Sequence, residues 1–384
     1  MNDQEVALVA GTRPEAIKLA PLAKALLNQG IRPHLVLTGQ QPHLRASDYG
    51  MPALATTELG CSGQPDPFAH ARLVTRTIGA AIHDAALVVV QGDTSSAFGG
   101  ALGAALAGIP VAHVEAGLRS HDRRNPWPEE DFRIGIDRLA ELLLAPTALN
   151  AANLRREGVR GAVHVTGNTG IDALLERLPL LRAAPETCAK RRLLVTCHRR
   201  ESWGEGLVGI AACLVALSHR GYAAIDMVLH PNPRVAGEMR RLLGCQRNIT
   251  LLEPCGHVEM LRRMQASDLI LSDSGGMQEE APALGIPLLI LRDRTERPEG
   301  IASGNAILVG RQPDRILSTV EMLFESDEAL QSMRRPSMPY GDGRSSDRIA
   351  AIIEAWLRRD EPRSPSLPTA TQSAGPSTRF ASRM

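Results

Sequence analysis

Short apolar runs alternate along this chain with longer stretches of helical periodicity. The runs are rich in Val, Leu and Ile and are bounded by Gly, Pro or Asp. Strands that are apolar at every position are typical of a parallel sheet covered by helices on both faces. The pattern predicts strands at residues 6–10, 35–38, 87–90, 111–114, 142–144 and 163–165, and again at 193–196, 227–229, 249–252, 269–271 and 288–291.

These strands are too many for one sheet, so the sequence predicts an α/β protein with two Rossmann-like, doubly wound domains. We expect an N-terminal domain at residues 1–180 and a C-terminal domain at 181–344, joined through the polar stretch 181–192. A last helix is expected over 345–359. Residues 360–384 are rich in Pro, Ser and Thr, so we expect a disordered tail without a catalytic role.

Two predicted helices begin and end alike. Asp93-Thr-Ser-Ser opens the first, which ends at Gly108-Ile-Pro, and Asp273-Ser-Gly-Gly opens the second, which ends at Gly285-Ile-Pro. An internal duplication and the general likeness of any two βαβ units both explain this repeat. Helical stretches are predicted at residues 14–27, 95–106 and 277–284.

The charge balance and the cysteines exclude several classes of protein. The net charge is +1, from 43 basic and 42 acidic side chains, which does not favour binding to nucleic acid or to an anionic membrane. The six cysteines form no CxxC pair and no zinc-ligand spacing with His, as expected for reduced thiols. The polar N-terminus lacks a secretory-signal pattern, and no apolar run approaches the ~20 residues of a membrane span. We therefore expect a cytoplasmic protein.

The turn Gly11-Thr-Arg-Pro-Glu15 follows the first predicted strand directly, and Pro14 suits the first turn of a helix. A Gly turn between a parallel strand and a helix N-terminus is a natural phosphate or sugar site. Arg13 and Lys18 add positive charge at this turn. An ordinary strand-to-helix turn is the alternative interpretation.

Asp273-Ser-Gly-Gly276 repeats this design later in the chain. Ser274 is a suitable helix cap, and Gly275 and Gly276 allow a diphosphate to approach backbone N–H groups. We therefore expect a diphosphate-binding helix N-terminus here.

Charged residues surround this second turn. Glu279 and Glu280 are expected in the first helical turn, where they either stabilise the helix end or accept two ribose hydroxyls. After the next strand come three arginines in a position that suits a polyphosphate, namely Arg292, Arg294 and Arg297.

Several acids follow predicted strands or lie on the loops beside them. Asp93, Glu115 and Glu129 do so in the first half, and His198 follows a strand of the second half. Each acid alone suggests a structural ion pair, but their convergence at strand ends facing one cleft suggests catalysis. Cys197 precedes His198, but neighbours in a strand point to opposite faces, so we reject a thiol nucleophile.

These motifs, in their order and spacing, resemble the non-hydrolysing UDP-N-acetylglucosamine 2-epimerases of bacteria, over roughly residues 5–358. The matching segments are Gly11-Thr-Arg-Pro-Glu-Ala-Ile-Lys18, Gly92-Asp-Thr94, His113-Val-Glu-Ala-Gly-Leu-Arg119, Trp127-Pro-Glu-Glu130, Thr166-Gly-Asn168, His198-Arg-Arg-Glu-Ser202, Asp273-Ser-Gly-Gly-Met-Gln-Glu-Glu280, Thr295-Glu-Arg-Pro298 and Pro339-Tyr-Gly-Asp-Gly343.

The resemblance implies a GT-B-like fold with the active site between the domains and the last helix crossing back to the first domain. It implies a homodimer, no metal or nicotinamide cofactor, and interconversion of UDP-GlcNAc and UDP-ManNAc for surface-polysaccharide synthesis. Its catalytic residues would be Asp93, Glu115, Glu129 and His198. Its substrate- and UDP-binding residues would be Arg13, Lys18, His230, Met260, Ser274, Gly275, Gly276, Glu280 and Arg297.

Two positions depart from the family pattern. Gln40 is followed by Gln41, Pro42 and His43, where relatives carry a His and a charged pair that belong to an activating UDP-GlcNAc site. Met260 stands where relatives often carry an aromatic side chain near the uracil. We therefore expect weakened activation, with the base packed on a thioether.

Three alternatives remain open from the sequence. The motifs hold the nucleotide together with C1 and C2, so they do not define the substituents at C3 and C6. A 2-epimerase of a diacetamido-uronic acid derivative and a hydrolysing epimerase both fit. A non-catalytic nucleotide-sugar binding module fits less well, because every expected carboxylate and His198 are retained.

Overall fold

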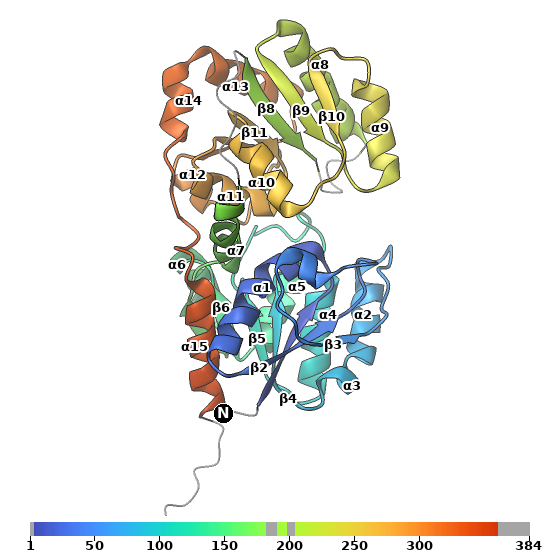
Figure 1. The fold of residues 1–384 in the computed structure, drawn as a ribbon, viewed down its shortest axis with the longest axis vertical. Helices are drawn as coiled ribbons and strands as arrows, with labels where there is room; N and C mark the ends of the chain where they lie inside the picture. Colours follow the sequence, from blue (N-terminus) through green and yellow to red (C-terminus); the bar gives the residue numbers. More distant parts are fainter. Residues whose placement is uncertain (1–3, 182–189, 198–203, 360–384) are drawn as a thin grey trace, which may run out of the picture.

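The computed structural model describes residues 4–181, 190–197 and 204–359. Two α/β domains lie end to end along the long axis of the molecule (Figure 1). The expected tail at 360–384, most of the expected linker and His198 lie outside the described residues. None of the helices in the described ranges has the length and apolarity needed to cross a membrane.

The first domain contains a seven-stranded parallel sheet in the order β3-β2-β1-β4-β5-β6-β7. Helices connect successive strands and cover both faces, as expected for strands that are apolar throughout. The elements are β1 (Glu5–Ala10), α1 (Arg13–Asn28), β2 (Arg32–Leu37), β3 (Ala55–Glu58), α2 (Pro67–Thr77), α3 (Gly79–Ile82), β4 (Ala85–Gln91), α4 (Ser95–Leu106), β5 (Val111–Val114), α5 (Glu129–Leu139), β6 (Leu142–Ala145), α6 (Ala148–Glu157), β7 (Ala162–Val165) and α7 (Thr169–Arg177), with short 3-10 turns at Ala46–Tyr49 and Leu178–Leu180.

The second domain contains a six-stranded parallel sheet in the order β10-β9-β8-β11-β12-β13. Its first four strands thus follow the same 3-2-1-4 order as the first sheet, and the two-domain Rossmann-like prediction is confirmed. The elements are β8 (Arg191–Thr196), α8 (Glu205–Arg220), β9 (Ala223–Val228), α9 (Pro233–Leu243), β10 (Ile249–Leu252), α10 (His257–Gln265), β11 (Leu269–Ser272), α11 (Gly275–Leu284), β12 (Leu288–Ile290), α12 (Glu299–Ala302), β13 (Ala306–Leu308), α13 (Pro313–Glu325) and α14 (Asp327–Met333).

The last helix, α15 (Ser345–Leu357), returns from the second domain and lies along the first (Figure 1). Its buried residues Ile349 and Ile353 join the core cluster that contains Leu19 and Leu22 of α1. The chain therefore passes between the domains twice, before β8 and again before α15.

Candidate active site

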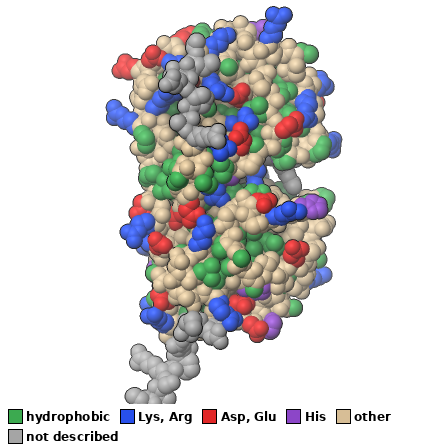
Figure 2. All heavy atoms as spheres, viewed as in Figure 1, with side chains coloured by type: hydrophobic (Ala, Val, Ile, Leu, Met, Phe, Trp, Pro, Cys, Tyr) green, Lys and Arg blue, Asp and Glu red, His purple; other side chains and the backbone are tan. Residues whose placement is uncertain are grey.

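The carboxyl ends of the strands in both domains face the region between the domains. Figure 2 shows the two halves meeting at a waist, with a notch on one side. Glu115, which follows β5, contacts Arg297 of the loop after β12, and Lys18 of α1 contacts Glu279 of α11. The site is therefore built by both domains together.

Four charged side chains form the centre of this region, and we call Lys18, Glu115, Glu279 and Arg297 the four-charge cluster. Nζ of Lys18 lies 2.6 Å from Glu115 and 2.8 Å from Glu279 of the other domain. Nε of Arg297 lies 2.6 Å from Glu279, and its Nη2 lies 3.5 Å from Glu115. All four side chains are buried, so each charge is stabilised by its oppositely charged partners, of which one lies in the other domain.

Glu115 is held in an unusual backbone conformation. It directly follows β5 with φ of +72°, a region that non-glycine residues rarely adopt. Its carboxylate accepts hydrogen bonds from Asn168 Nδ2 at 3.1 Å and from the Gln91 side chain. Such strain at a buried, fully hydrogen-bonded carboxylate is typical of a functional site.

The two acids of the cluster titrate differently. Burial raises the pKa of Glu115, and a hydrogen bond with Glu279 adds to this rise, although Lys18 opposes it. Burial also acts on Glu279, but Lys18 and Arg297 outweigh it and lower the pKa of Glu279 to about 2. Environments that drive the pKa values of two neighbouring carboxyl groups apart in this way are typical of acid/base sites. Glu115 therefore holds a proton more readily than its neighbour Glu279.

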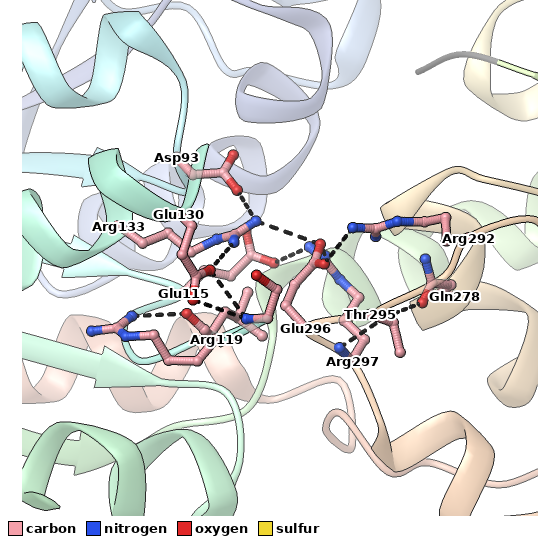
Figure 3. A network of polar contacts seen from close by, with 12 residues as sticks. Asp93, Glu115, Arg119, Glu130, Arg133, Gln278, Arg292, Thr295, Glu296 and Arg297 are labelled. Atoms are coloured by element: carbon pink, nitrogen blue, oxygen red, sulfur yellow. Dashed lines mark hydrogen bonds and ion pairs between the residues drawn. The ribbon is translucent and has the colours of Figure 1, made fainter. Parts of the chain in front are cut away.

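A second set of charges lies beside the cluster (Figure 3). The buried Arg133 of α5 donates to Glu130 at 2.8 Å and to Asp93, and it lies 3.5 Å from Glu296 of the second domain. Glu296 also pairs with Arg292 at 2.9 Å. The sequence singled out Asp93 and Arg292 but missed Arg133 and Glu296. Arg133 lies three residues after Glu130 on one helix, a spacing that offers a local signal for the pair.

A buried histidine supports the loop that carries Asp93. Nε2 of His113 donates to the carbonyl of Gly92 at 2.8 Å, and its Nδ1 lies 2.6 Å from Asp137. Asp137 also accepts from Arg119 at 2.7 Å. These contacts fix the main chain immediately before Asp93.

The Gly11 turn does not form a backbone phosphate site, contrary to our expectation. The carboxylate of Glu15 accepts from the N–H groups of Gly11 and Thr12 at 2.8 and 2.7 Å. The N–H group of Arg13 donates to Gln41. The backbone donors of this turn are therefore occupied, and α1 serves the site through its side chains.

The second predicted turn is built differently. Ser274 occupies the N-cap position of α11, but its side chain makes no capping hydrogen bond. A Cβ added to Gly275 would lie 3.0 Å from the guanidinium carbon of Arg297, so a side chain here would crowd that guanidinium. The prediction that Glu279 and Glu280 lie in the first turn is wrong, because α11 begins at Gly275 and these residues lie one turn later.

The remaining predicted binding residues lie mainly on the second domain. Arg13 crosses to it and donates to the carbonyl of Cys255 at 3.2 Å. Glu280 pairs with His257 at 2.6 Å. Met260 of α10 is half-buried, and His230 follows β9 and accepts from the N–H group of Asn232.

Two further predictions concern catalytic groups. Glu129 is half-buried at the first position of α5, four residues before Arg133, which pairs with Asp93. Burial raises the pKa of the Cys197 thiol well above its usual range, which agrees with rejecting it as a nucleophile. Within the described ranges, no group of three or more His, Cys, Asp or Glu residues is arranged to hold a metal ion.

Comparisons with known proteins agree with the site. The family model for UDP-N-acetylglucosamine 2-epimerase matches residues 28–354. The UDP-N-acetylglucosamine 2-epimerase of Salmonella typhimurium is 36% identical, over 92% of this chain and 99% of the relative. The crystal structure of UDP-GlcNAc 2-epimerase from Neisseria meningitidis, bound to UDP-GlcNAc, has a TM-score of 0.85 at 35% identity, over 92% of this chain and all of that one.

A more distant likeness concerns the fold alone. MurG of Acinetobacter baumannii is 14% identical and has a TM-score of 0.56, over 92% of this chain and 99% of that chain. With the two parallel sheets, this likeness confirms the GT-B-like fold class predicted from the sequence.

Proposed function

This chain belongs to the UDP-N-acetylglucosamine 2-epimerase family, and we propose that its four-charge cluster interconverts UDP-GlcNAc and UDP-ManNAc by removing UDP and adding it back. It is accordingly an isomerase that acts on a nucleotide sugar.

The chemistry defines what the site must supply. The proton on C2 is not next to a carbonyl, so a base alone removes it slowly. When the C1–O bond breaks, its electron pair leaves with UDP, and the cationic character at C1 acidifies C2. Loss of the C2 proton then gives 2-acetamidoglucal. The epimer forms when a proton is returned to the opposite face of C2 and UDP adds back to C1 with its original configuration. The site therefore needs a base, a means of holding the diphosphate, and a second proton carrier.

The environment of Glu115 is the observation that best supports the proposal. Burial raises the pKa of Glu115 above the usual range of a glutamate, which suits a group that both takes up and returns a proton. It lies within 3.5 Å of two cations from opposite domains, so a diphosphate bound by those cations brings the sugar close to it. We assign Glu115 as the acid/base group at C2.

The other groups divide between chemistry and nucleotide binding. We assign Asp93 and Glu129 as acid/base groups that serve the opposite face of C2, with His198 as a fourth catalytic group. Arg13, Lys18, Arg297 and the α11 start at Ser274, Gly275 and Gly276 would hold the diphosphate. Glu280 would accept the ribose hydroxyls, and His230 and Met260 would lie toward the nucleoside.

Incubation of the protein with UDP-GlcNAc, followed by chromatography of the products, tests the proposal. We expect UDP-ManNAc to accumulate to an equilibrium mixture. Release of free ManNAc and UDP would instead indicate a hydrolysing epimerase. An unchanged substrate would indicate a binding module.

The proposal includes a cytoplasmic homodimer. The resemblance of the sequence motifs to the family is the basis for this part of the proposal. Light scattering after size-exclusion chromatography should give twice the mass of one chain. The mass of a single chain would contradict this part of the proposal.

A further inference from the structure

Tyr340 lies in the segment where the chain returns from the second domain to the first. It follows α14 and precedes α15, and only 1% of its surface is exposed. Burial raises the pKa of its phenol, so the hydroxyl stays protonated and able to donate. A buried hydroxyl between two domains is favourable only when it is hydrogen-bonded.

The hydroxyl of Tyr340 contacts the second domain alone. It donates to the carbonyl of Arg297 at 3.0 Å and accepts from the N–H group of Gly300 at 2.9 Å. Both partners belong to the stretch from the end of the β12 loop to α12. One side chain therefore holds the main chain of the residue whose guanidinium enters the four-charge cluster.

The backbone of Tyr340 contacts the first domain. Its carbonyl accepts from the N–H group of Asn168 at 2.8 Å. The side chain of Asn168 in turn donates to Glu115 at 3.1 Å. Tyr340 is thus linked to Glu115 through hydrogen bonds of Asn168. On the other side, it is hydrogen-bonded directly to the main chain of Arg297.

Two glycines allow this contact with the first domain. Gly341 has φ of +144°, and a Cβ there would lie 3.2 Å from the N atom of Asn168. Gly167 has φ of +90°, and a Cβ there would lie 2.4 Å from Oγ of Ser345. The two segments approach so closely that any side chain at these positions would separate them.

We propose that Tyr340 is a positioning residue that sets the distance between Glu115 and Arg297 and so keeps UDP and 2-acetamidoglucal together between elimination and re-addition. This inference rests on the proposed function. Once the C1–O bond has broken, no covalent bond joins the two products. Re-addition then depends on how firmly the domain that binds UDP is held against the domain that holds the sugar.

The test replaces Tyr340 by Phe, which keeps the ring and removes the hydroxyl. Tyr222→Phe is the matched control, because the Tyr222 hydroxyl bonds Glu325 at 2.6 Å at an exposed site within the second domain. The measured quantity is the ratio of released UDP and 2-acetamidoglucal to UDP-ManNAc formed. We expect this ratio to rise about tenfold in Tyr340→Phe, the scale of a lost buried hydrogen bond, and to stay unchanged in Tyr222→Phe.

A folded Tyr340→Phe protein whose release ratio equals that of the wild type would overturn the inference, even if its melting temperature has fallen. A merely structural tyrosine lowers stability and turnover without changing how the intermediate is partitioned. If the wild type forms no UDP-ManNAc, the proposed function fails. Amide hydrogen exchange then tests separately whether Tyr340 couples the two domains.

Amide exchange needs no turnover. In Tyr340→Phe we expect faster exchange at Gly300, which loses its acceptor, and also at Asn168 in the other domain. Faster exchange at Gly300 alone would overturn the coupling. If the variant does not fold, exchange in the wild type with and without UDP gives the same answer. Both amides should gain protection together, and protection of Gly300 alone would contradict the inference.

Discussion

Helices α4 and α11 occupy equivalent places in their two sheets, but their first turns are built differently. Each helix follows the strand that lies fourth in the shared 3-2-1-4 order, and each opens after an aspartate, Asp93 or Asp273. The sequence repeat noted at these two segments thus coincides with equivalent topology.

Side chains at the first turn of α4 form hydrogen bonds within the first domain. Thr94 accepts from the N–H group of Ala97, which caps the helix. Ser95 donates to the buried His70 at 2.7 Å, and His70 in turn donates to the carbonyl of Cys61. The hydroxyls of Thr94 and Ser96 also donate within the first domain, to Glu15 and Gln40.

The first turn of α11 carries glycines where α4 carries serines. Gly275 and Gly276 bring no side chain to the helix start, and Ser274 leaves it without a side-chain cap. Arg297 lies against Gly275 in this space. The comparison supports a proposed division of labour, in which the first domain supplies the carboxylates that carry protons and the second supplies backbone donors and Arg297 for the diphosphate, together with Arg13 and Lys18 of the first.

The largest effect should come from Glu115→Gln, which removes one acid/base carboxylate from the first domain and leaves the second domain intact. We expect kcat to fall at least ~10²-fold, the usual scale of general acid/base catalysis. UDP affinity should change little, because Arg13, Arg297 and the start of α11 would still hold the diphosphate. Steady-state kinetics and calorimetric titration with UDP check both parts. Near-normal turnover would break the division of labour.

The support behind Asp93 predicts an acid-dependent stability. Burial opposes ionisation of Asp137, but His113 and Arg119 lower the pKa of its carboxyl below the usual 3.8. A lowered native pKa means that the ionised group stabilises the fold above about pH 4 and that this contribution disappears as the pH falls through the native value. Asp137→Asn breaks a buried pair and should cost about 3 kcal/mol at pH 7.

Melting curves between pH 2 and pH 7 check this expectation. The difference in melting temperature between the wild type and Asp137→Asn should be largest at pH 7 and should shrink below about pH 4. A difference that stays constant down to pH 2 would show that Asp137 is not ionised in the folded protein.

Exchanging one residue between the two helix starts sharpens the comparison. Gly275→Ser gives α11 the residue of α4, and it should weaken UDP binding about tenfold by crowding the helix end and Arg297. Ser95→Gly is the reverse change, and it should lower the melting temperature by about 2–6 °C through the lost hydrogen bond to His70. UDP titration and thermal unfolding of both variants check these expectations. Weakened UDP binding in Ser95→Gly together with a lowered melting temperature but normal UDP binding in Gly275→Ser would refute this contrast.

The smallest effect is expected when UDP-GlcNAc is added as an activator of the reverse reaction. Gln40 and Gln41 bond Ser96 and the N–H group of Arg13, so this segment supports the first domain's side of the site. Pro42 and His43 replace the polar groups expected of an activating site. Reverse turnover of UDP-ManNAc should therefore start without a long lag, and a trace of UDP-GlcNAc should change the rate little. A long lag abolished by that trace would contradict this prediction.

The parts of the fold that sequence could predict were those set by local pattern. The bounds of α4 were predicted as observed, because a cap and a glycine stop mark its ends. Strands β3 and β13 were missed because they lie at sheet edges. β3 is mostly exposed and polar, and β13 has only three residues.

The site was predictable as a set of residue types but not as a set of pairs. Lys18, Glu115 and Arg297 were identified from motifs, whereas the role of Glu279 as their ionised partner required the contact between domains. Tyr340 lay in a recognised motif without an assigned role, since its partners lie 40 or more residues away in sequence. Contacts of that range follow from packing and leave no periodic signal in the chain.

The fate of the C2 hydrogen tests the central claim most directly. If Glu115 and its neighbouring acids abstract and return a proton, UDP-ManNAc formed in D2O should carry deuterium at C2, as seen by loss of the C2 proton signal in NMR. UDP-ManNAc that retains protium at C2 after turnover in D2O would contradict proton transfer through these carboxylates, while leaving the fold and the division into two domains as described.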